Sequence, residues 1–356
     1  MSHFCLLSDS TSYVPLNWDL LTDEPTRKHW LDLFDNHFAH AMKHASAHYG
    51  RVVNKPVAAA AAEFSQAIAQ LRENPASLPS GKLDMIELCR LRERILRKHK
   101  LNDPYKQLKD RENASAMKLY SQVVRKVHSL NHTSKWQHLI GCVFAGNLFD
   151  KGSSATAYLA DESTDFIETL EKTQPRPWLV DDFDRLAADL PAAAPLKWFK
   201  AVVFIDNAGS DFILGVMPLV REMALMGTRI VLAANELPSL NDMTVNETER
   251  VVAQLATIDL DLDALIQAGM FEVVSSGSDI PLIDLSNVSD ELNAASADAD
   301  MVILEGMGRA IESNFDASFK VDTLKLALLK DPVIAQRLGG ELLDCVCKYE
   351  PAPAAI

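Results

Sequence analysis

Basic residues are in deficit in this chain of 356 residues. It has 35 lysines and arginines against 49 aspartates and glutamates, which gives a net charge of −14. Nucleic acids and anionic membrane surfaces are bound through clustered cations, so this balance argues against both as the main partner. The sequence also lacks any apolar run near the ~20 residues that a membrane-spanning helix needs. We therefore expect neither a nucleic acid nor a membrane as its partner.

Cysteine is scarce as well, and the five cysteines form an odd count. This usage is typical of a reducing compartment rather than of a disulfide framework. The first twenty residues have no basic segment followed by an apolar core, so they do not read as a secretory signal. These features predict a cytoplasmic protein, and nothing in the composition sets its oligomeric state.

The first part of the chain is predicted to be helical. Apolar residues recur there every three or four positions, as in Trp30, Phe34, Phe38, Met42 and Ala45. Such patterns predict helices over residues 26–52, 57–71, 82–99 and 112–130. No strand signal occurs before about residue 135. We therefore predict a helical N-terminal subdomain over residues 1–134 and a second domain over residues 135–356.

The second domain shows short β-branched and aliphatic runs. They predict strands over residues 201–205, 229–233, 271–275, 301–304 and 341–348. Between the first two runs, apolar residues lie at helical spacing and Gly227 follows as a helix terminator. A strand, a crossover helix and a strand form the unit of a parallel sheet covered on both faces, so the expected class is α/β. The run from Trp136 to Phe144 is too short to assign.

Polar side chains follow several of these strands. Asp206, Asn207 and Asp211 come after the first strand, Asp242 comes after the second, and Glu305 comes at the end of the fourth. Ligands of open parallel sheets bind beyond the carboxyl ends of the strands. Carboxylate and amide oxygens suit Mg²⁺ or Mn²⁺. The alternative is that Asp206 or Asp211 only caps the helix that begins near Ser210.

Two glycines and an arginine follow the fourth strand in the string Glu305-Gly306-Met307-Gly308-Arg309. The dinucleotide fingerprint G-x-G-x-x-G is not completed, and no G-x-x-x-x-G-K-S/T loop occurs, which excludes a nicotinamide cofactor and a P-loop. Glycines allow close backbone approach, and an arginine there can clamp an anion. The alternative is a glycine turn with a surface arginine.

Five histidines cluster on the first predicted helix, at positions 29, 37, 40, 44 and 48. No cysteine or acidic partner completes a zinc set nearby. A solvated helix face is the interpretation that this pattern favours.

Four strings in order resemble one known family. They are GNLFD with Asn147, DNAGSD at 206–211, LPSLND ending at Asp242, and EGMGR at 305–309. Together with DPYKQLKDREN at 103–113, they resemble the metal-dependent damage-control phosphatases. EGMGR marks the subfamily related to the C-terminal domain of pantothenate kinases.

The resemblance implies a three-layer α/β/α fold with a mainly parallel sheet. It implies a divalent metal (Mn²⁺, Ni²⁺, Co²⁺ or Mg²⁺) held by Asp206, Asn207 and Asp242, with Asp206 and Asp242 as catalytic residues. The remaining predicted contacts are to the substrate phosphate: Asn147, Glu305, Gly306, Met307, Gly308, Arg309 and Lys325. Lys325 matches the lysine of the Arg-Thr-x-Lys string of other subfamilies, whose arginine is replaced here by Asp322.

The expected activity is hydrolysis of phosphomonoesters of small metabolites. The subfamily implies 4′-phosphopantetheine and its oxidised forms, such as the sulfonate, as substrates whose removal protects coenzyme A synthesis. Related members imply sugar phosphates as an alternative. Attack by water and attack by Asp206 with an aspartyl phosphate both remain open.

The sequence disfavours two other classes of protein. A methyl transferase that uses S-adenosylmethionine is disfavoured, because the first turn lacks a glycine-rich loop. A non-catalytic metabolite-binding module is disfavoured because every metal-donor position and EGMGR are intact.

Overall fold

The computed structural model describes residues 2–15, 18–148, 166, 170 and 175–353. Its helices and helical turns are α1 (Glu24–Tyr49), η1 (Gly50–Val53), α2 (Asn54–Glu73), η2 (Pro75–Ser77), α3 (Met85–Lys98), α4 (Lys106–His128), α5 (His132–Leu148), α7 (Phe183–Ala188), η3 (Asp211–Val216), α8 (Met217–Leu225), α9 (Val245–Ala256), α10 (Leu260–Gln267), α11 (Asp290–Ser296), η4 (Met307–Glu312) and α12 (Pro332–Arg337). Its strands are β1 (Val180–Asp181), β2 (Lys200–Phe204), β3 (Arg229–Ala234), β4 (Phe271–Ser275), β5 (Met301–Glu305), β6 (Asp322–Leu328) and β7 (Cys345–Glu350).

The strands form one sheet in the order β1-β7-β6-β5-β2-β3-β4. All neighbours pair in parallel except β6 and β7, which are antiparallel. The chain moves outward from β2 to β3 and β4, and then crosses back to place β5 on the other side of β2. The loops that follow β2 and β5 therefore diverge from a common point, which is the switch point where open sheets bind ligands.

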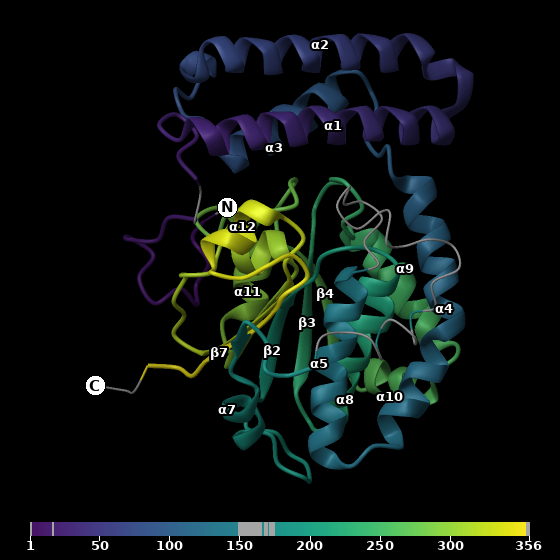
Figure 1. The fold of residues 1–356 in the computed structure, drawn as a ribbon. Helices are drawn as coiled ribbons and strands as arrows, with labels where there is room; N and C mark the ends of the chain where they lie inside the picture. The colour runs from purple at the N-terminus through teal and green to yellow at the C-terminus, as the bar shows by residue number, and fades with distance from the viewer. Residues whose placement is uncertain (1, 16–17, 149–165, 167–169, 171–174, 354–356) are drawn as a thin grey trace.

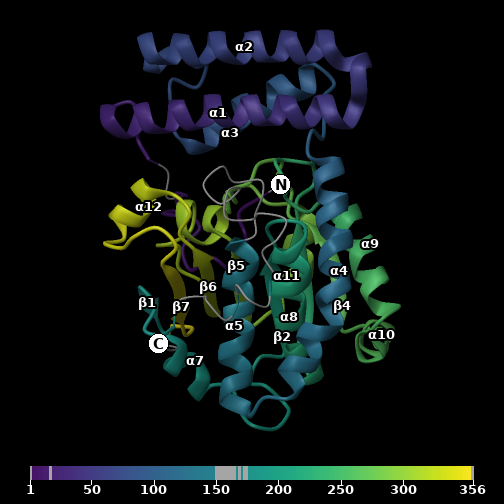
Figure 2. The ribbon, with the colours of Figure 1, turned by 45° about the vertical axis from the view of Figure 1, so that its right-hand side comes forward.

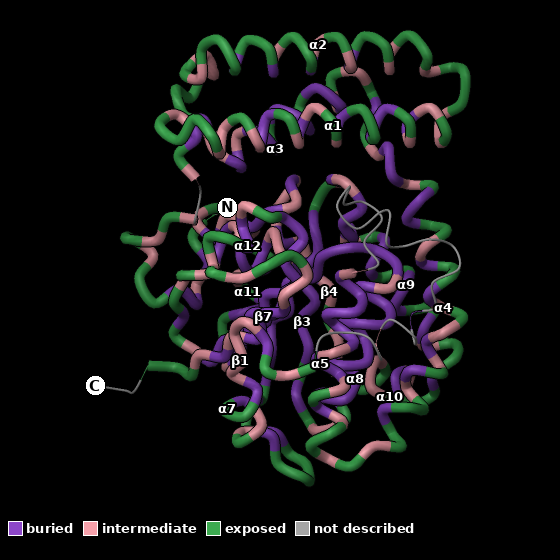
Figure 3. The backbone as a smooth tube through the Cα atoms, in the orientation of Figure 1, coloured by how far each residue is buried: buried purple, intermediate pink, exposed green. Residues whose placement is uncertain are grey.

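The central strands are buried along their whole length, as Figure 3 shows. Alternate residues of β2 face opposite sides: Val202 and Phe204 join one apolar core, whereas Ala201 and Val203 join the other. Helices α4, α5 and α8 supply the second core, and α11 and α12 contribute to the first. The predicted three-layer α/β/α class, with a mainly parallel sheet, is confirmed.

Helices α1, α2 and α3 form a separate layer across one end of the sheet (Figures 1 and 2). Asp23 caps α1 by accepting a hydrogen bond from the backbone N–H of Thr26. The buried stripe of α1 is the one predicted from its periodicity, and it packs on α2 and α3. The helical N-terminal region is thus confirmed.

The division of the chain at residue 134 stays a prediction. Helix α4 lies before that residue and α5 lies after it, yet both pack in the same core against the sheet. Residues Trp136 to Phe144, which the sequence left unassigned, belong to α5.

The strands at 201–205, 229–233, 271–275 and 301–304 appear at nearly those positions, whereas the last strand begins at Cys345 rather than at residue 341. Strand β6 was not predicted because a lysine interrupts its apolar pattern. All five cysteines are free thiols. Among the helices of the described residues, none is both long enough and apolar enough to cross a bilayer.

Candidate active site

The switch point of the sheet brings two of the predicted strings together. Asp206 and Asn207 follow β2, and Glu305 ends the neighbouring strand β5. The backbone N–H of Asp206 donates to Oε2 of Glu305 over 3.2 Å. Asn207 also forms a β-bridge with Asp242, which lies in the loop after β3. Three loop segments that are distant in sequence thus converge at one edge of the sheet.

Arg309 joins two of the predicted carboxylates. Its Nη1 pairs with Oδ1 of Asp206, and its Nη2 pairs with Oδ2 of Asp242 at 2.9 Å. Nη2 also donates to Oδ1 of Asn235 at 3.0 Å, and Asn235 in turn donates to Oδ2 of Asp242 at 3.0 Å. The arginine is buried, so it is not the surface residue of the alternative interpretation. One cationic group therefore already lies between Asp206 and Asp242.

A second group of oxygens lies deeper, behind Asp206. Asp206, Asp211 and Glu305 each offer a carboxylate oxygen, and these three atoms lie within 4.8 Å of one another. Asn147 donates from Nδ2 to Asp211 at 2.7 Å and to Glu305. Asn207 donates to Asp211 from its backbone and from its side chain, at 3.2 and 3.0 Å. We call Asp206, Asp211 and Glu305 the inner acidic cluster.

The inner acidic cluster is too negative to be fully ionised without a counter-charge. Burial and the adjacent Asp211 carboxylate raise the pKa of Glu305 well above its ordinary value. Burial also raises the pKa of Asp211, and the charge of Lys330 opposes both shifts. Either a proton or a cation must therefore neutralise part of the negative charge on these two carboxyl groups.

The helix-cap alternative for these aspartates is not observed. Ser210 occupies the N-cap position of η3, and no side chain caps that turn. The Asp211 carboxylate instead receives hydrogen bonds from Asn147 and Asn207. Asp211 therefore belongs to the site, as the predicted sheet edge suggested.

The glycines of the EGMGR string are required by close packing. Gly306 has φ +90°, and a Cβ atom at this position would overlap the carboxylate of Asp206. A Cβ atom at Gly308 would lie 2.6 Å from the carbonyl oxygen of Pro281. Met307 and Gly308 line the cavity described below. The string thus brings the backbone against the Asp206 carboxylate, and its contact with the substrate phosphate stays a prediction.

Helix α4 supports the loops from the other side. Lys109 is buried and pairs with Glu247 at 2.9 Å, and its Nζ lies 3.5 Å from the carbonyl oxygen of Asp242. The side chain of Asn113 accepts a hydrogen bond from the backbone N–H of Gly209 at 2.7 Å. Both residues belong to the DPYKQLKDREN string, which therefore positions the loops after β2 and β3.

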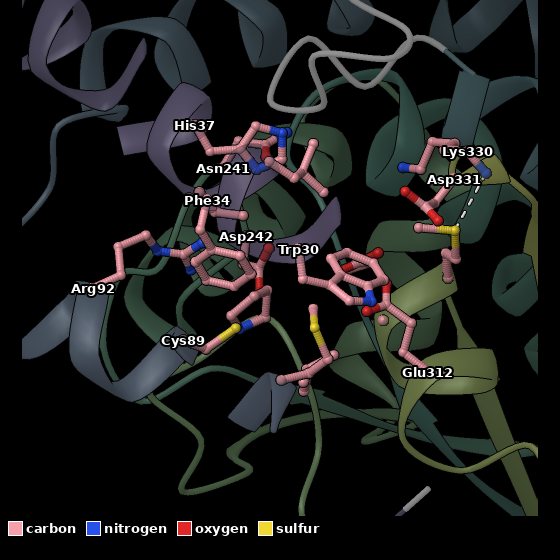
Figure 4. A pocket seen from close by; sticks show the side chains of 18 of the residues that line it. Trp30, Phe34, His37, Cys89, Arg92, Asn241, Asp242, Glu312, Lys330 and Asp331 are labelled. Atoms are coloured by element: carbon pink, nitrogen blue, oxygen red, sulfur yellow. Dashed lines mark hydrogen bonds between the residues drawn. The ribbon is translucent and has the colours of Figure 1, made fainter. Parts of the chain in front are cut away.

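A cavity of about 210 Å³ lies between the helical layer and this edge of the sheet. Asp206, Asn207 and Asp242 line its floor, and Trp30 and Phe34 of α1 line its roof with residues of α3. Figure 4 shows Trp30, Phe34 and Arg92 of the helical layer around the same space as Asp242 and Lys330. The apolar stripe of α1 was expected only to form core, but part of it faces this cavity.

Two histidines of the α1 cluster also line the cavity, namely His29 and His37. Nε2 of His29 lies 2.8 Å from Oδ2 of Asp331, next to the start of α12. The interpretation of the whole cluster as a solvated helix face is therefore wrong for these two residues. The reason is that α1 lies against the ends of the strands, which no periodicity reveals.

Lys325 is not at the cavity. It lies on β6, and its ammonium donates to the carbonyl oxygens of Phe315 and Ala317 and to Glu350, at 2.9, 2.8 and 2.9 Å. Its three donors are thereby used, so this geometry gives no support to the prediction that Lys325 binds phosphate. Lys330, which follows β6, lines the cavity instead.

Glu312 at the end of η4 also lines the cavity, and no described residue donates a hydrogen bond to it. Burial and the charge of Asp331 raise its pKa from 4.5 to about 8, against the opposing charge of Lys330. His29 and the Cys89 thiol face the same space. The folded protein therefore holds a proton on Glu312 at pH values where the unfolded chain has lost it.

This difference predicts a pH-dependent stability. The stabilising contribution of the Glu312 proton to the free energy of unfolding is complete below pH 4.5. This contribution is lost as the pH rises towards 8. In chelator-treated protein at pH 8, Glu312→Gln should therefore raise the free energy of unfolding by on the order of 2 kcal/mol. Urea denaturation at pH 5 and pH 8 measures this. The exposed control Glu341→Gln should show no such gain, and an equal gain in both variants would contradict the prediction.

The oxygens of the site suit a hard divalent cation. Mg²⁺ and Mn²⁺ favour carboxylate and amide oxygens, and Mg²⁺ sites often use one or two carboxylates together with substrate phosphate. Asp206 and Asp242 already converge on one cationic group, the Arg309 guanidinium. Oδ1 of Asn147 is buried and has no hydrogen-bond partner among the described residues. The inner acidic cluster of Asp206, Asp211 and Glu305, with Asn147 beside it, can therefore hold a metal ion.

Some site residues were missed or assigned another role. Asn235 follows β3 and was visible as a strand-end polar residue, and Asp211 was weighed as a cap. Lys330 follows β6, a strand that was not predicted. Glu312 follows the EGMGR string. Trp30 gave no separate signal, because an indole at helical spacing usually means core.

Comparisons with known proteins agree with the resemblance. Residues 34–346 match the damage-control phosphatase ARMT1-like domain. A damage-control phosphatase of Arabidopsis thaliana is 39% identical over 332 residues, which cover 91% of this chain and 88% of that protein. A 4′-phosphopantetheine phosphatase of Mus musculus is 32% identical over 404 residues, and pantothenate kinase 2 of A. thaliana is 37% identical over 377 residues. These alignments cover 97% and 98% of this chain.

The chain spans 48% of the mouse phosphatase and 42% of the plant kinase. Among solved structures, a DUF89 family protein of Pyrococcus horikoshii matches with a TM-score of 0.61 and 18% identity, over 89% of this chain and 96% of that one. This likeness shows a shared fold. By the extent of the domain match and by its relatives, the chain belongs to the damage-control phosphatase family and is a phosphatase.

Proposed function

We propose that this phosphatase is metal-dependent and hydrolyses phosphomonoesters of small metabolites, with 4′-phosphopantetheine and its oxidised forms as the preferred substrates. The observation that carries the proposal is the pairing of the buried Arg309 with Asp206 and Asp242, two carboxylates that line one cavity. The likeness to the mouse 4′-phosphopantetheine phosphatase supports the substrate. A role in protecting coenzyme A synthesis, and the cytoplasmic location expected from composition, stay predictions.

Asp206, Asn207 and Asp242 are the residues that we assign to the metal. All three line the cavity, where a phosphate can reach them, whereas Asp211 and Glu305 lie behind them. A divalent cation held here would neutralise phosphate charge and activate water. Glu305, another member of the inner acidic cluster, accepts a hydrogen bond from the backbone N–H of Asp206 and so holds this residue in place.

The remaining side chains bind and orient the phosphate. Arg309 donates to the two cavity-lining carboxylates Asp206 and Asp242, and its planar fork suits phosphate oxygens. Lys330 lines the opposite wall and adds positive charge. Asn147 orients the inner carboxylates through Nδ2. The apolar roof from α1 restricts water, which strengthens these charge interactions.

The test is phosphate release by chelator-treated protein, with and without Mn²⁺, Ni²⁺, Co²⁺ or Mg²⁺. The substrates are 4′-phosphopantetheine, its sulfonate, several sugar phosphates and an aryl phosphate. We expect release that requires metal, is fastest with the pantetheine compounds, and falls by on the order of 1000-fold in Asp242→Ala. Asp298→Asn, at an exposed carboxylate distant from the site, is the control.

Two results would change the proposal. Full activity without metal would overturn the metal assignment. Faster hydrolysis of sugar phosphates would replace the substrate, and absence of release with every metal would leave a binding module.

A further inference from the structure

The roof of the cavity contains hydrogen-bond donors that the phosphate chemistry does not use. We propose that Trp30 Nε1 and Arg92 Nη1 bind oxygen atoms of the substrate's leaving group, so that α1 and α3 select phosphomonoesters of extended alcohols that carry amide or hydroxyl oxygens. This inference rests on the proposed function, because it assigns the part of the same substrate that lies beyond the phosphate.

Trp30 carries the first donor. Its side chain is 3% exposed, and its ring nitrogen has no hydrogen-bond partner among the described residues. The indole is held in place by edge contacts with the rings of Trp18 and His29, whose centroids lie at 5.8 and 5.2 Å. In Figure 4 it lies in the middle of the cavity, with its nitrogen turned towards the side of Glu312. A buried donor without a partner costs about 1–3 kcal/mol, which a bound acceptor recovers.

The position of this donor matters more than its lack of a partner. Trp136 on α5 also has a buried ring nitrogen without a partner among the described residues. Trp136 packs in the core against the sheet and is not among the residues that line the cavity. The two indoles therefore share the same unsatisfied donor, but only that of Trp30 adjoins a space that a ligand can enter.

Arg92 on α3 supplies the second donor. Its Nε donates to Glu93 at 2.8 Å, and its Nη2 donates to Oγ of Ser239 at 3.2 Å. Nη1 donates to none of the residues that the structure describes. The guanidinium carbon lies 5.6 Å from the centre of the Phe34 ring, and both side chains line the cavity. Arg92 is thereby fixed in place with one nitrogen left to bind a ligand.

Together these groups define the chemistry of the leaving group. Two fixed donors require acceptor oxygens, while Phe34, Leu33 and Met85, which line the same cavity, require apolar segments. An alcohol with alternating carbonyl or hydroxyl oxygens and hydrocarbon meets both requirements. A compact alcohol such as methanol meets neither. The roof therefore favours a pantetheine-like chain over small phosphate esters.

The experiment compares the two tryptophans. Binding of pantetheine, the dephosphorylated product, is measured by calorimetry for the wild type, Trp30→Phe and Trp136→Phe. The Ki of inorganic phosphate and the KM for 4′-phosphopantetheine are measured for the same proteins. Phenylalanine keeps an aromatic ring and removes the ring N–H, and thermal unfolding checks that each variant is folded.

We expect Trp30→Phe to weaken pantetheine binding and to raise the KM by about tenfold, with the Ki of phosphate unchanged. Trp136→Phe should match the wild type in all three constants. Three results would overturn the inference: no binding of pantetheine by the wild type, unchanged binding in Trp30→Phe, or an equal loss for pantetheine and phosphate. A wild type that binds pantetheine but releases no phosphate would instead overturn the proposed function.

Discussion

Replacing Gly306 by alanine is expected to abolish the phosphatase activity, with a loss of at least about 1000-fold in kcat/KM. The added Cβ atom would overlap the Asp206 carboxylate, which would have to leave its position beside Arg309. The φ angle of +90° adds strain of about 1–2 kcal/mol for any residue other than glycine. We therefore also expect the free energy of unfolding to fall by about 2–4 kcal/mol. Steady-state kinetics and urea denaturation measure the two effects.

Gly339 provides a matched control for this prediction. It has φ +73°, and nothing lies within 4 Å of the position that its Cβ atom would take. Gly339→Ala should therefore show the conformational cost alone, about 1 kcal/mol, with full activity. If Gly306→Ala kept its activity or lost no more than Gly339→Ala, the close approach to Asp206 would have no catalytic importance.

Asp206→Asn should lower kcat by on the order of 1000-fold and weaken metal binding. Asp206 belongs to both parts of the site: it lines the cavity and pairs with Arg309, and it is a member of the inner acidic cluster. The amide keeps the shape of the side chain but removes the charge that a cation requires. Calorimetric titration with Mn²⁺ and steady-state phosphate release measure the two losses.

The free energies of unfolding of Asp206→Asn and Asp206→Ala separate the effect of the lost charge from the effect of the lost packing. Among the residues that the structure describes, Asp206→Ala leaves the Arg309 guanidinium with Asp242 as its one carboxylate partner, so it should cost more stability than Asp206→Asn. Asp316→Asn, at an exposed carboxylate, is the control for kinetics. Wild-type metal affinity in Asp206→Asn would contradict the metal assignment.

Acid quenching during turnover of a phosphate ester labelled in its phosphate distinguishes attack by water from attack by Asp206. Attack by Asp206 leaves the labelled phosphate on the protein, whereas attack by water does not.

Much of the site could be predicted from the sequence because its residues follow strands. Asp206, Asn207 and Asp242 come just after apolar runs, and the carboxyl ends of parallel strands share one edge. The EGMGR string placed Arg309 beside them for the same reason. In the structure Asp206, Asn207 and Asp242 line one cavity, and Arg309 pairs with the two aspartates.

The roles of the lysines could not be predicted in this way. Lys325 lies within β6 and is paired with Glu350 and two carbonyl groups, whereas Lys330 lies past the end of that strand and reaches the cavity. A buried lysine interrupts the apolar pattern of a strand, so β6 itself was not predicted. Its ammonium is satisfied only by partners that the tertiary structure supplies.

The sequence by itself determined the α/β class, the helical N-terminal region and the cluster of acidic residues with Arg309 at the sheet edge, because periodicity and strand ends are local properties of the chain. Only the tertiary structure decided that α1 and α3 form the roof of the cavity, that Asn147 donates to Asp211 in the inner acidic cluster, and that Trp30 lines a ligand space. These features depend on how a helical layer packs against loops far away in sequence, and periodicity alone does not distinguish a side chain in a core from one that lines a cavity.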